Sequence, residues 1–308
     1  MPSRPSPRRT FGVHEGAMLL RMTGFFDFSA SAITSLARED VARALAEDVG
    51  AADLTAGLVD AARRARARVL CRESAVICGA PWAEAALRAI APDARMQWHV
   101  AEGQRCTRDQ VVLEIEAPAR ALLSAERTML NFLQLLSAVA TKTATYVEAV
   151  QGTRAQIVDT RKTLPGLRLA QKYAVRCGGG TNHRIGLFDA VLIKENHIAA
   201  AGGITPVLQA AARVAAQAQF VEIEVETLSQ LEEALAAGAK MILLDNMPMT
   251  DLHEAVRINA GRAILEISGG VTLQSVRALA QTGVDRISIG ALTKDVKAVD
   301  FSMRLQEP

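Results

Sequence analysis

The second half of this 308-residue chain repeats one pattern six times: a short apolar run, then polar or glycine residues, with alanine-rich segments between the runs. Near-continuous apolar runs are typical of strands that are buried on both faces of a parallel sheet. Parallel strands need crossover connections, and six strand–helix units are most simply closed into a barrel. The predicted strands are Gln156–Asp159, Ala190–Lys194, Phe220–Glu224, Met241–Asp245, Ala263–Ile267 and Arg286–Ile289.

The alanine-rich segments between these runs predict helices at Thr205–Ala218, Leu228–Ala237 and Leu273–Thr282. Gly238 and Gly283 follow two of them, as expected for the residue that ends a helix.

The first half of the chain has a different order of elements. From Ala30 to about Glu126 the patterns alternate irregularly between helical and extended, which predicts a small α+β layer. Pro118 then opens a long apolar helical stretch that reaches about Val150 and carries Arg127 on its polar stripe. Within the layer the predicted helices are Thr34–Glu47 and Pro81–Ile90, and the predicted strands are Arg66–Cys71, Ala75–Cys78, Met96–Ala101 and Val111–Glu116.

Composition excludes several classes of protein. Half of the residues are apolar and 22% are charged, so the chain can bury a core and is not of the disordered or collagenous type. No 18-residue apolar run is free of charge, which argues against a membrane span. Aromatic residues are only 4%, too few for base-stacking platforms on nucleic acid. Met1–Thr10 is rich in Pro, Ser and Arg and predicts a disordered tail rather than a signal peptide.

The four cysteines form no CxxC pair, so we expect free thiols in a reducing compartment and a cytoplasmic protein. They are Cys71, Cys78, Cys106 and Cys177.

The strongest functional signal lies where the predicted strands end. In a parallel barrel these ends converge on the face where barrel enzymes place their active sites. One side of that face is cationic and a neighbouring side is anionic, whereas the last two ends are glycine-rich and precede helices, as phosphate sites do. The cations are Arg161, Lys162, His183, Arg184 and Lys194; the anions are Glu224 and Asp245; the glycine-rich ends are Ser268-Gly269-Gly270 and Gly290-Ala291-Leu292.

This arrangement predicts one substrate with several carboxylates, a second with phosphates, and a divalent metal ion between them. Glu224 and Asp245, together with phosphate oxygens, suit Mg²⁺, which binds to few protein ligands and keeps several waters.

Several long motifs resemble one family, the nicotinate-nucleotide pyrophosphorylases (carboxylating), also called quinolinate phosphoribosyltransferases. The resemblance covers about residues 30 to 305. The central motifs are Glu126-Arg127-Thr128, Asp159-Thr160-Arg161-Lys162-Thr163, Gly178-Gly179-Gly180-Thr181-Asn182-His183-Arg184, Lys194-Glu195-Asn196-His197, Glu222-Ile223-Glu224, Leu244-Asp245-Asn246 and Ser268-Gly269-Gly270.

The resemblance implies a reaction and a role for each residue. Family members join quinolinate to phosphoribosyl pyrophosphate and release pyrophosphate and CO₂, which yields nicotinate mononucleotide for NAD biosynthesis. By similarity, Lys162, Glu224 and Asp245 are the catalytic residues: Lys162 would lie between the two substrates, and the two acids would hold Mg²⁺ and face the ribose. The quinolinate carboxylates would be held by Arg127, Arg161, His183, Arg184 and Lys194, and the 5′-phosphate by Ser268, Gly269 and Gly290.

The resemblance also implies an α/β sandwich domain followed by an open six-stranded parallel α/β barrel, similar to a TIM barrel. We expect a disordered tail at 1–24, the sandwich at 25–128 with 293–308 returning to it, and the barrel at 129–292. Family active sites form across a homodimer, so Arg127 would reach the pocket of the partner subunit.

Other interpretations remain open on sequence alone. A paralogous phosphoribosyltransferase of the molybdenum-transport-associated group would share the fold, and Lys194 also fits a Schiff-base aldolase or a catalytically silent phosphate-binding barrel. Arg127 could simply pair with Glu126, and Glu222 could line the interior of the barrel. Lys172 and Arg176, four residues apart, predict a solvated helix face.

Overall fold

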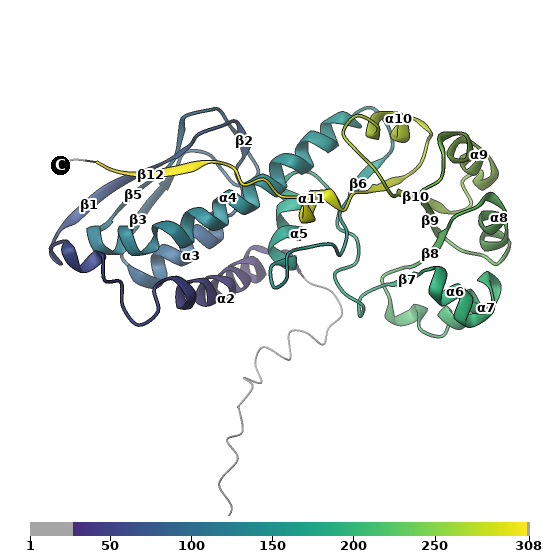
Figure 1. Cartoon of the computed structure of the whole chain (residues 1–308), viewed down its shortest axis with the longest axis horizontal. Helices are drawn as coiled ribbons and strands as arrows, with labels where there is room; N and C mark the ends of the chain where they lie inside the picture. Colours follow the sequence, from purple (N-terminus) through teal and green to yellow (C-terminus); the bar gives the residue numbers. More distant parts are fainter. Residues whose placement is uncertain (1–26, 307–308) are drawn as a thin grey trace, which may run out of the picture.

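The computed structural model describes residues 27–306, which form two lobes side by side (Figure 1). The predicted disordered tail at 1–24 lies outside the described residues. In that described part of the chain, no helix combines the length and the apolar character needed to cross a membrane.

The first lobe is a four-stranded antiparallel sheet with helices packed on it (Figure 1). In its central strand the arginines Arg64, Arg66 and Arg68 point to solvent, whereas the residues between them turn inward, as the period of two in a strand requires. The strands, in sheet order, are β12 (Phe301–Gln306), β1 (Arg64–Cys71), β5 (Gln110–Pro118) and β3 (Arg95–Trp98). The other elements are α2 (Ala30–Asp48), η1 (Ala56–Leu58), β2 (Ala75–Val76), α3 (Ala80–Ile90) and β4 (Arg105–Cys106).

Helix α4 (Ala119–Ala149) connects the two lobes. Its first turns, including Leu122 and Leu133, are buried in the core of the first lobe. Its last turns place Tyr146 and Val150 in the core of the second lobe. One 31-residue helix therefore joins both hydrophobic cores.

The second lobe is a six-stranded parallel sheet, and all six predicted strands are present. The first two strands of this lobe along the chain form the two edges of the sheet. The sheet therefore curls into a barrel that stays open between these two strands. The predicted fold class is confirmed. In sheet order the strands are β6 (Gln156–Val158), β11 (Arg286–Ser288), β10 (Ile264–Ser268), β9 (Met241–Asp245), β8 (Val221–Val225) and β7 (Val191–Ile193).

The helices of this lobe differ in part from those predicted. The predicted helix 205–218 ends at Ala211, and the predicted helix 273–282 begins only at Val276, because Thr272 and Ser275 bond to each other in a turn. The helices are α5 (Arg168–Cys177), α6 (Glu195–Ala201), α7 (Ile204–Ala211), η2 (Ala215–Gln217), α8 (Leu228–Ala236), α9 (Met249–Asn259), α10 (Val276–Gln281) and α11 (Ala291–Lys294).

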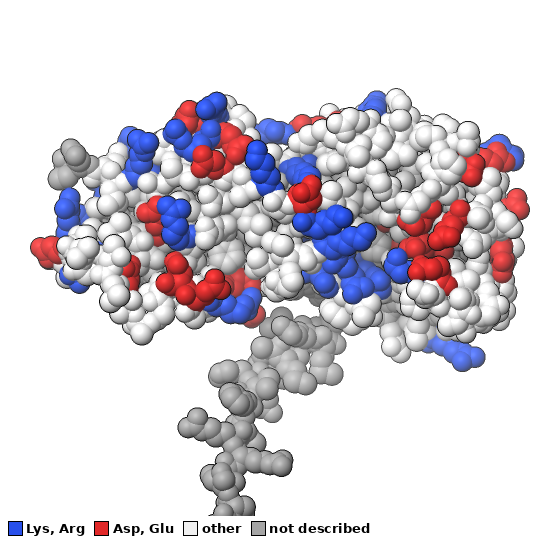
Figure 2. All heavy atoms as spheres, in the orientation of Figure 1, with Lys and Arg blue, Asp and Glu red and all other residues white. Residues whose placement is uncertain are grey.

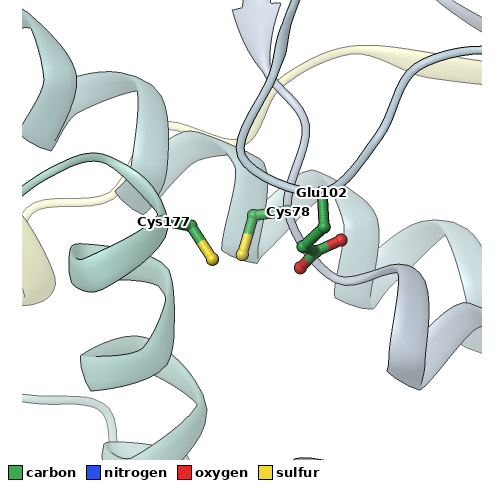
Figure 3. A group of neighbouring side chains, drawn as sticks. All are labelled: Cys78, Glu102 and Cys177. Carbon is green, nitrogen blue, oxygen red and sulfur yellow. The ribbon is translucent and has the colours of Figure 1, made fainter. Parts of the chain in front are cut away.

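After α11 the chain returns to the first lobe, where β12 pairs antiparallel with β1 (Figure 1). The two lobes also meet at Cys78, Glu102 and Cys177, whose side chains lie close together (Figure 3). The Glu102 carboxylate accepts hydrogen bonds from the backbone N–H groups of Gly79 (2.8 Å) and Ala80 (3.0 Å) and so caps the start of α3. A cation would be repelled by this helix N-terminus, so the cluster is a structural contact between the lobes, and its thiols are free.

Candidate active site at the carboxyl ends of the barrel strands

The predicted site residues Glu224, Asp245 and Ser268 lie at the carboxyl ends of neighbouring parallel strands. Asp245 is directly paired with Ser268 in the register of β9 and β10, and Glu224 lies on the adjacent strand β8. Figure 2 shows Lys and Arg side chains gathered at the middle of the molecule and Asp and Glu side chains beside them over the barrel.

Two arginines form the core of the cationic side. Arg184 is 8% exposed, and within residues 27–306 its guanidinium donates a hydrogen bond only to the carbonyl oxygen of Ala190, at 3.4 Å. Burial, and then the positive charge of Arg161, lower the pKa of Arg184. Arg161 Nε is itself buried and has no hydrogen-bond partner within residues 27–306. Two cations held near each other with an unsatisfied donor favour an anionic ligand.

The loop that carries Arg161 is braced by Arg168. Its guanidinium donates to Thr163 Oγ1 (3.0 Å), to the carbonyl oxygen of Ile185 (3.0 Å) and to that of Arg161 (3.4 Å). Arg168 therefore ties the loop after β6 to the segment that follows Arg184.

His183 lies inside the barrel wall. Its Nε2 is 2.7 Å from Glu222 Oε2, and its Nδ1 accepts the backbone N–H of Arg184 at 2.8 Å. Burial lowers the pKa of His183, so the ring is neutral and its one proton is on Nε2, where it is donated to Glu222. A contact between this ring and a substrate carboxylate would require His183 to break the bond to Glu222.

Glu222 and Glu266 are fully buried beneath this ring, and the predicted lining role of Glu222 fits its position. Arg286 Nε donates to Glu266 at 2.7 Å, whereas one oxygen of each carboxyl group has no hydrogen-bond partner within the described chain. Burial raises the pKa of both carboxyl groups to about 7. Together with His183 they resemble a three-ligand metal cluster, but the proton on Nε2 blocks that nitrogen as a ligand.

The anionic side is joined to the cationic side by one contact. Lys194 Nζ lies 2.7 Å from Glu224 Oε2, and Glu224 is 8% exposed. A Schiff-base aldolase needs a lysine nitrogen that is free to attack a carbonyl carbon, whereas Lys194 Nζ contacts a carboxylate here. Asp245 accepts a hydrogen bond from Asn246 Nδ2 at 2.7 Å. Two carboxylates on adjacent strands form a donor set that suits Mg²⁺ with a phosphorylated ligand.

The glycine-rich strand ends are shaped by their neighbours. A Cβ atom at Gly269, where φ is +95°, would lie 2.0 Å from Asn246 Oδ1, so only glycine fits there. A Cβ at Gly290 would lie 3.1 Å from the side chain of Lys162, which places these two residues in contact distance. Gly290 directly precedes α11, as predicted. Ser268-Gly269-Gly270 also precedes a helix, as predicted, but the 272–275 turn lies between these residues and α10.

Arg127 lies on α4, with its side chain 64% exposed and its guanidinium 3.1 Å from Glu126 Oε1. In residues 27–306 no hydrogen bond or ion pair links it to the other predicted substrate-binding residues.

One pair near the site was missed by the sequence analysis. Lys172 is fully buried and forms an ion pair with the fully buried Asp159, so the prediction of a solvated face is wrong for Lys172. Arg176, by contrast, is exposed as predicted. The signal in the sequence is the pair of small apolar residues Ala170 and Ala174, which indicate a helix that packs against the core. A lysine on such a helix can be buried when a carboxylate pairs with it.

Comparison with known proteins identifies the same relatives by sequence and by structure. The quinolinate phosphoribosyl transferase N-terminal domain matches residues 53–137, and the C-terminal domain of that family matches residues 139–304. Nicotinate-nucleotide pyrophosphorylase (carboxylating) of Mycobacterium leprae is 44% identical over 276 residues, which cover 87% of this chain and 97% of the relative.

The probable enzyme of the same name in Bacillus subtilis is 40% identical over 257 residues, covering 83% of this chain and 89% of the relative. The solved nicotinate-nucleotide pyrophosphorylase of Francisella tularensis superposes with a TM-score of 0.86 at 42% identity, covering 89% of this chain and 97% of that one.

Proposed function

This chain belongs to the quinolinate phosphoribosyltransferase family, and from that premise we propose how its own residues carry the family reaction. The reaction forms a bond between the pyridine nitrogen of quinolinate and C1 of phosphoribosyl pyrophosphate, and pyrophosphate leaves. The carboxylate at C2 of the pyridine ring then leaves as CO₂, which gives nicotinate mononucleotide for NAD biosynthesis.

Arg161 and Arg184 are the proposed anchors of the two quinolinate carboxylates, with Lys194 beside them. The observation that carries this assignment is the buried, unpartnered Nε of Arg161 next to the buried guanidinium of Arg184. Planar guanidinium groups match a planar dicarboxylate through paired hydrogen bonds. His183 belongs to the same pocket wall and supports Arg184 through the hydrogen bond between Nδ1 and the Arg184 backbone.

The phosphoribosyl group is proposed to bind across the remaining strand ends. Ser268, Gly269 and Gly290 would offer backbone N–H groups to the 5′-phosphate. Lys162, whose side chain borders Gly290, would lie between the phosphoribosyl group and the pyridine ring.

Glu224 and Asp245 are the proposed metal ligands. Mg²⁺, when bound, would neutralise the charge of the leaving pyrophosphate. The same two carboxylates face the ribose, where positive charge develops at C1 as the bond to pyrophosphate breaks, and negative charge placed there in advance lowers the barrier. No side-chain nucleophile is needed for such a dissociative transfer.

Decarboxylation then requires little additional chemistry from the protein. Once the ring nitrogen carries the ribose, the electron pair of the breaking bond between C2 and the carboxylate stays on C2, where the adjacent positively charged nitrogen stabilises it. A proton from water then adds to C2, which gives the C2–H bond of the product. Arg161 and Arg184 hold the ring in place during this step, and the burial of Arg184 disfavours a solvated carboxylate beside it.

The assembly is proposed to be a cytoplasmic homodimer with shared sites. Arg127 is exposed on α4, and among the described residues it pairs only with the neighbouring Glu126, which leaves it available to enter the site of a second subunit.

A product assay tests the proposed acceptor. The protein is incubated with phosphoribosyl pyrophosphate, Mg²⁺ and either quinolinate or nicotinate, and nicotinate mononucleotide is quantified by chromatography. We expect quinolinate to be used. The kcat/KM for nicotinate should be lower by on the order of 10³-fold or more, because the missing carboxylate leaves a buried cation unpaired. Arg161→Gln should abolish most activity, whereas Arg257→Gln, on the exposed helix α9, should not. Comparable use of nicotinate would contradict the dicarboxylate pocket.

A further inference from the structure

The segment that carries His183 and Arg184 is fastened to the open edge of the barrel. Thr181 runs parallel to β6: its N–H donates to the carbonyl oxygen of Ile157 at 2.8 Å, and its own carbonyl oxygen accepts the N–H of Asp159 at 3.1 Å. Because β6 is an edge strand of the sheet, this segment borders the gap in the barrel. The pairing at Thr181 is an isolated bridge and not a longer strand pair. Side chains must therefore hold the segment between Thr181 and Arg184 in place.

Asp159 is the first of those side chains. It is fully buried at the end of β6, and both carboxylate oxygens are used. Oδ1 accepts the backbone N–H of His183 at 2.8 Å and an ammonium proton of Lys172, whereas Oδ2 accepts from Asn182 Nδ2 at 2.7 Å. One carboxylate therefore holds two consecutive residues of the segment.

Lys172 holds the same residue from its other side. Its ammonium group, fully buried on α5, donates to the carbonyl oxygen of His183 at 2.9 Å as well as to Asp159. The N–H and the C=O of His183 are thus both fixed by this pair. A buried ion pair is weak evidence for a role in stability, since apolar pairs of the same size are often equally stable. The position of the pair indicates a role other than stability.

The ion pair of Asp159 and Lys172 connects the two segments that carry Arg161 and Arg184. Asp159 is two residues before Arg161, and His183 is directly before Arg184. The two guanidinium groups proposed to bind quinolinate stand on these two segments. We propose that Asp159 and Lys172 are positioning residues that set the separation of Arg161 and Arg184, and hence the fit of the pocket to two carboxylates. This inference rests on the proposed function.

Three variants test this role. Lys172→Met and Asp159→Asn each leave one buried charge or donor unpaired, and the double variant removes both charges together. We expect each to raise the KM for quinolinate about tenfold or more, since small displacements of binding groups have such effects, while the KM for phosphoribosyl pyrophosphate changes less than about threefold. Ile33→Ala, a buried change in the first lobe, serves as a destabilised control with normal KM values.

The double variant separates positioning from stability. If the pair only stabilises the fold, removing both charges restores the melting temperature and the KM together, and the proposal is overturned. If the pair positions the pocket, the double variant regains stability but keeps a raised KM, because the methionine side chain that replaces Lys172 cannot donate to the His183 carbonyl oxygen. Asn182→Ala removes one hydrogen bond to Asp159 from a partly buried position, and it should also raise the KM for quinolinate. This variant tests the positioning role if the charge variants do not fold.

The wild-type protein is assayed first with quinolinate. No turnover there overturns the proposed function, whereas wild-type turnover with an unchanged quinolinate KM in the folded variants overturns the positioning role alone.

Discussion

Lys194 Nζ and Glu224 Oε2 lie 2.7 Å apart, so a residue proposed to bind quinolinate touches a residue proposed to bind the metal ion and face the ribose. The two halves of the site therefore share one ion pair. A change at Glu224 is transmitted to the carboxylate pocket, whereas Asp245, which bonds to Asn246, has no such link to a cation within the described chain.

This difference predicts distinct effects for two charge-removing variants. Glu224→Gln and Asp245→Asn should each lower kcat roughly 10²-fold or more, as expected when one electrostatic stabiliser of a transition state is lost. Calorimetry of quinolinate binding without the second substrate should separate them: Asp245→Asn should bind normally, and Glu224→Gln should bind more tightly because Lys194 is released. Activity should also fall with a chelator and return with Mg²⁺. A folded Asp245→Asn protein with wild-type turnover would contradict the metal assignment.

A second prediction concerns the partner subunit. Arg127→Ala and Arg161→Ala should each be nearly inactive, because both are proposed carboxylate anchors. If Arg127 acts in the partner's site, mixing the two variants should restore up to about a quarter of wild-type activity, through heterodimers in which one of two sites is intact. Subunit exchange is verified by a mass tag. No recovery after exchange would place Arg127 outside the partner's site.

The strand ends were predictable because a buried parallel strand must be apolar until it leaves the sheet. The first polar residues after each run, such as Lys194 and Asp245, therefore mark the functional face in the sequence itself. The same reasoning found all six strands of the barrel.

The burial of Lys172 was not predictable in this way. Its neighbours in sequence include Arg168 and Arg176, which makes the helix look solvated. Its partner Asp159 lies on the other side of a loop, directly after β6. The engagement of His183 with Glu222 was hidden for the same reason, since the two residues are 39 positions apart. Local pattern reports which face of an element is apolar, but pairing of buried charges depends on tertiary contacts.

A third prediction concerns the contact between the loop at Gly178 and helix α4. A Cβ atom at Gly178 would lie 2.4 Å from the carbonyl oxygen of Ala140 and 2.7 Å from Cβ of Thr143, both of which are firmly held in α4. Gly178→Ala should therefore lower the free energy of unfolding by about 1–3 kcal/mol or more, as overpacking does. Gly57→Ala, with nothing within 4 Å of its Cβ, is the matched control. Urea unfolding of both variants decides, and equal stabilities would contradict the close packing.

The last prediction concerns Glu266 and the pH dependence of stability. Burial, reinforced by the charge of Glu222, raises the pKa of Glu266 to about 7 from its ordinary value of 4.5. Between these two values the folded protein keeps a proton that the unfolded chain has released. The free energy of unfolding contributed by this group must therefore fall as pH rises from about 4.5 to about 7, and stay level above that.

Glu266→Gln removes this titration but keeps an oxygen that can accept from Arg286. Relative to the variant, the wild-type protein should lose on the order of a few kcal/mol of stability across that interval. His183, whose pKa is lowered, acts with the opposite sign in the same interval, and Glu222, whose pKa is also raised to about 7, acts with the same sign. Both groups interact with Glu266, so the difference between the two proteins measures Glu266 together with its coupling to them. The exposed Glu254, whose pKa is lowered by Arg257, contributes only at lower pH, so Glu254→Gln is the control. Urea unfolding at about pH 5 and pH 8 measures the change, and parallel wild-type and Glu266→Gln curves would show that the buried carboxyl group is already ionised at low pH.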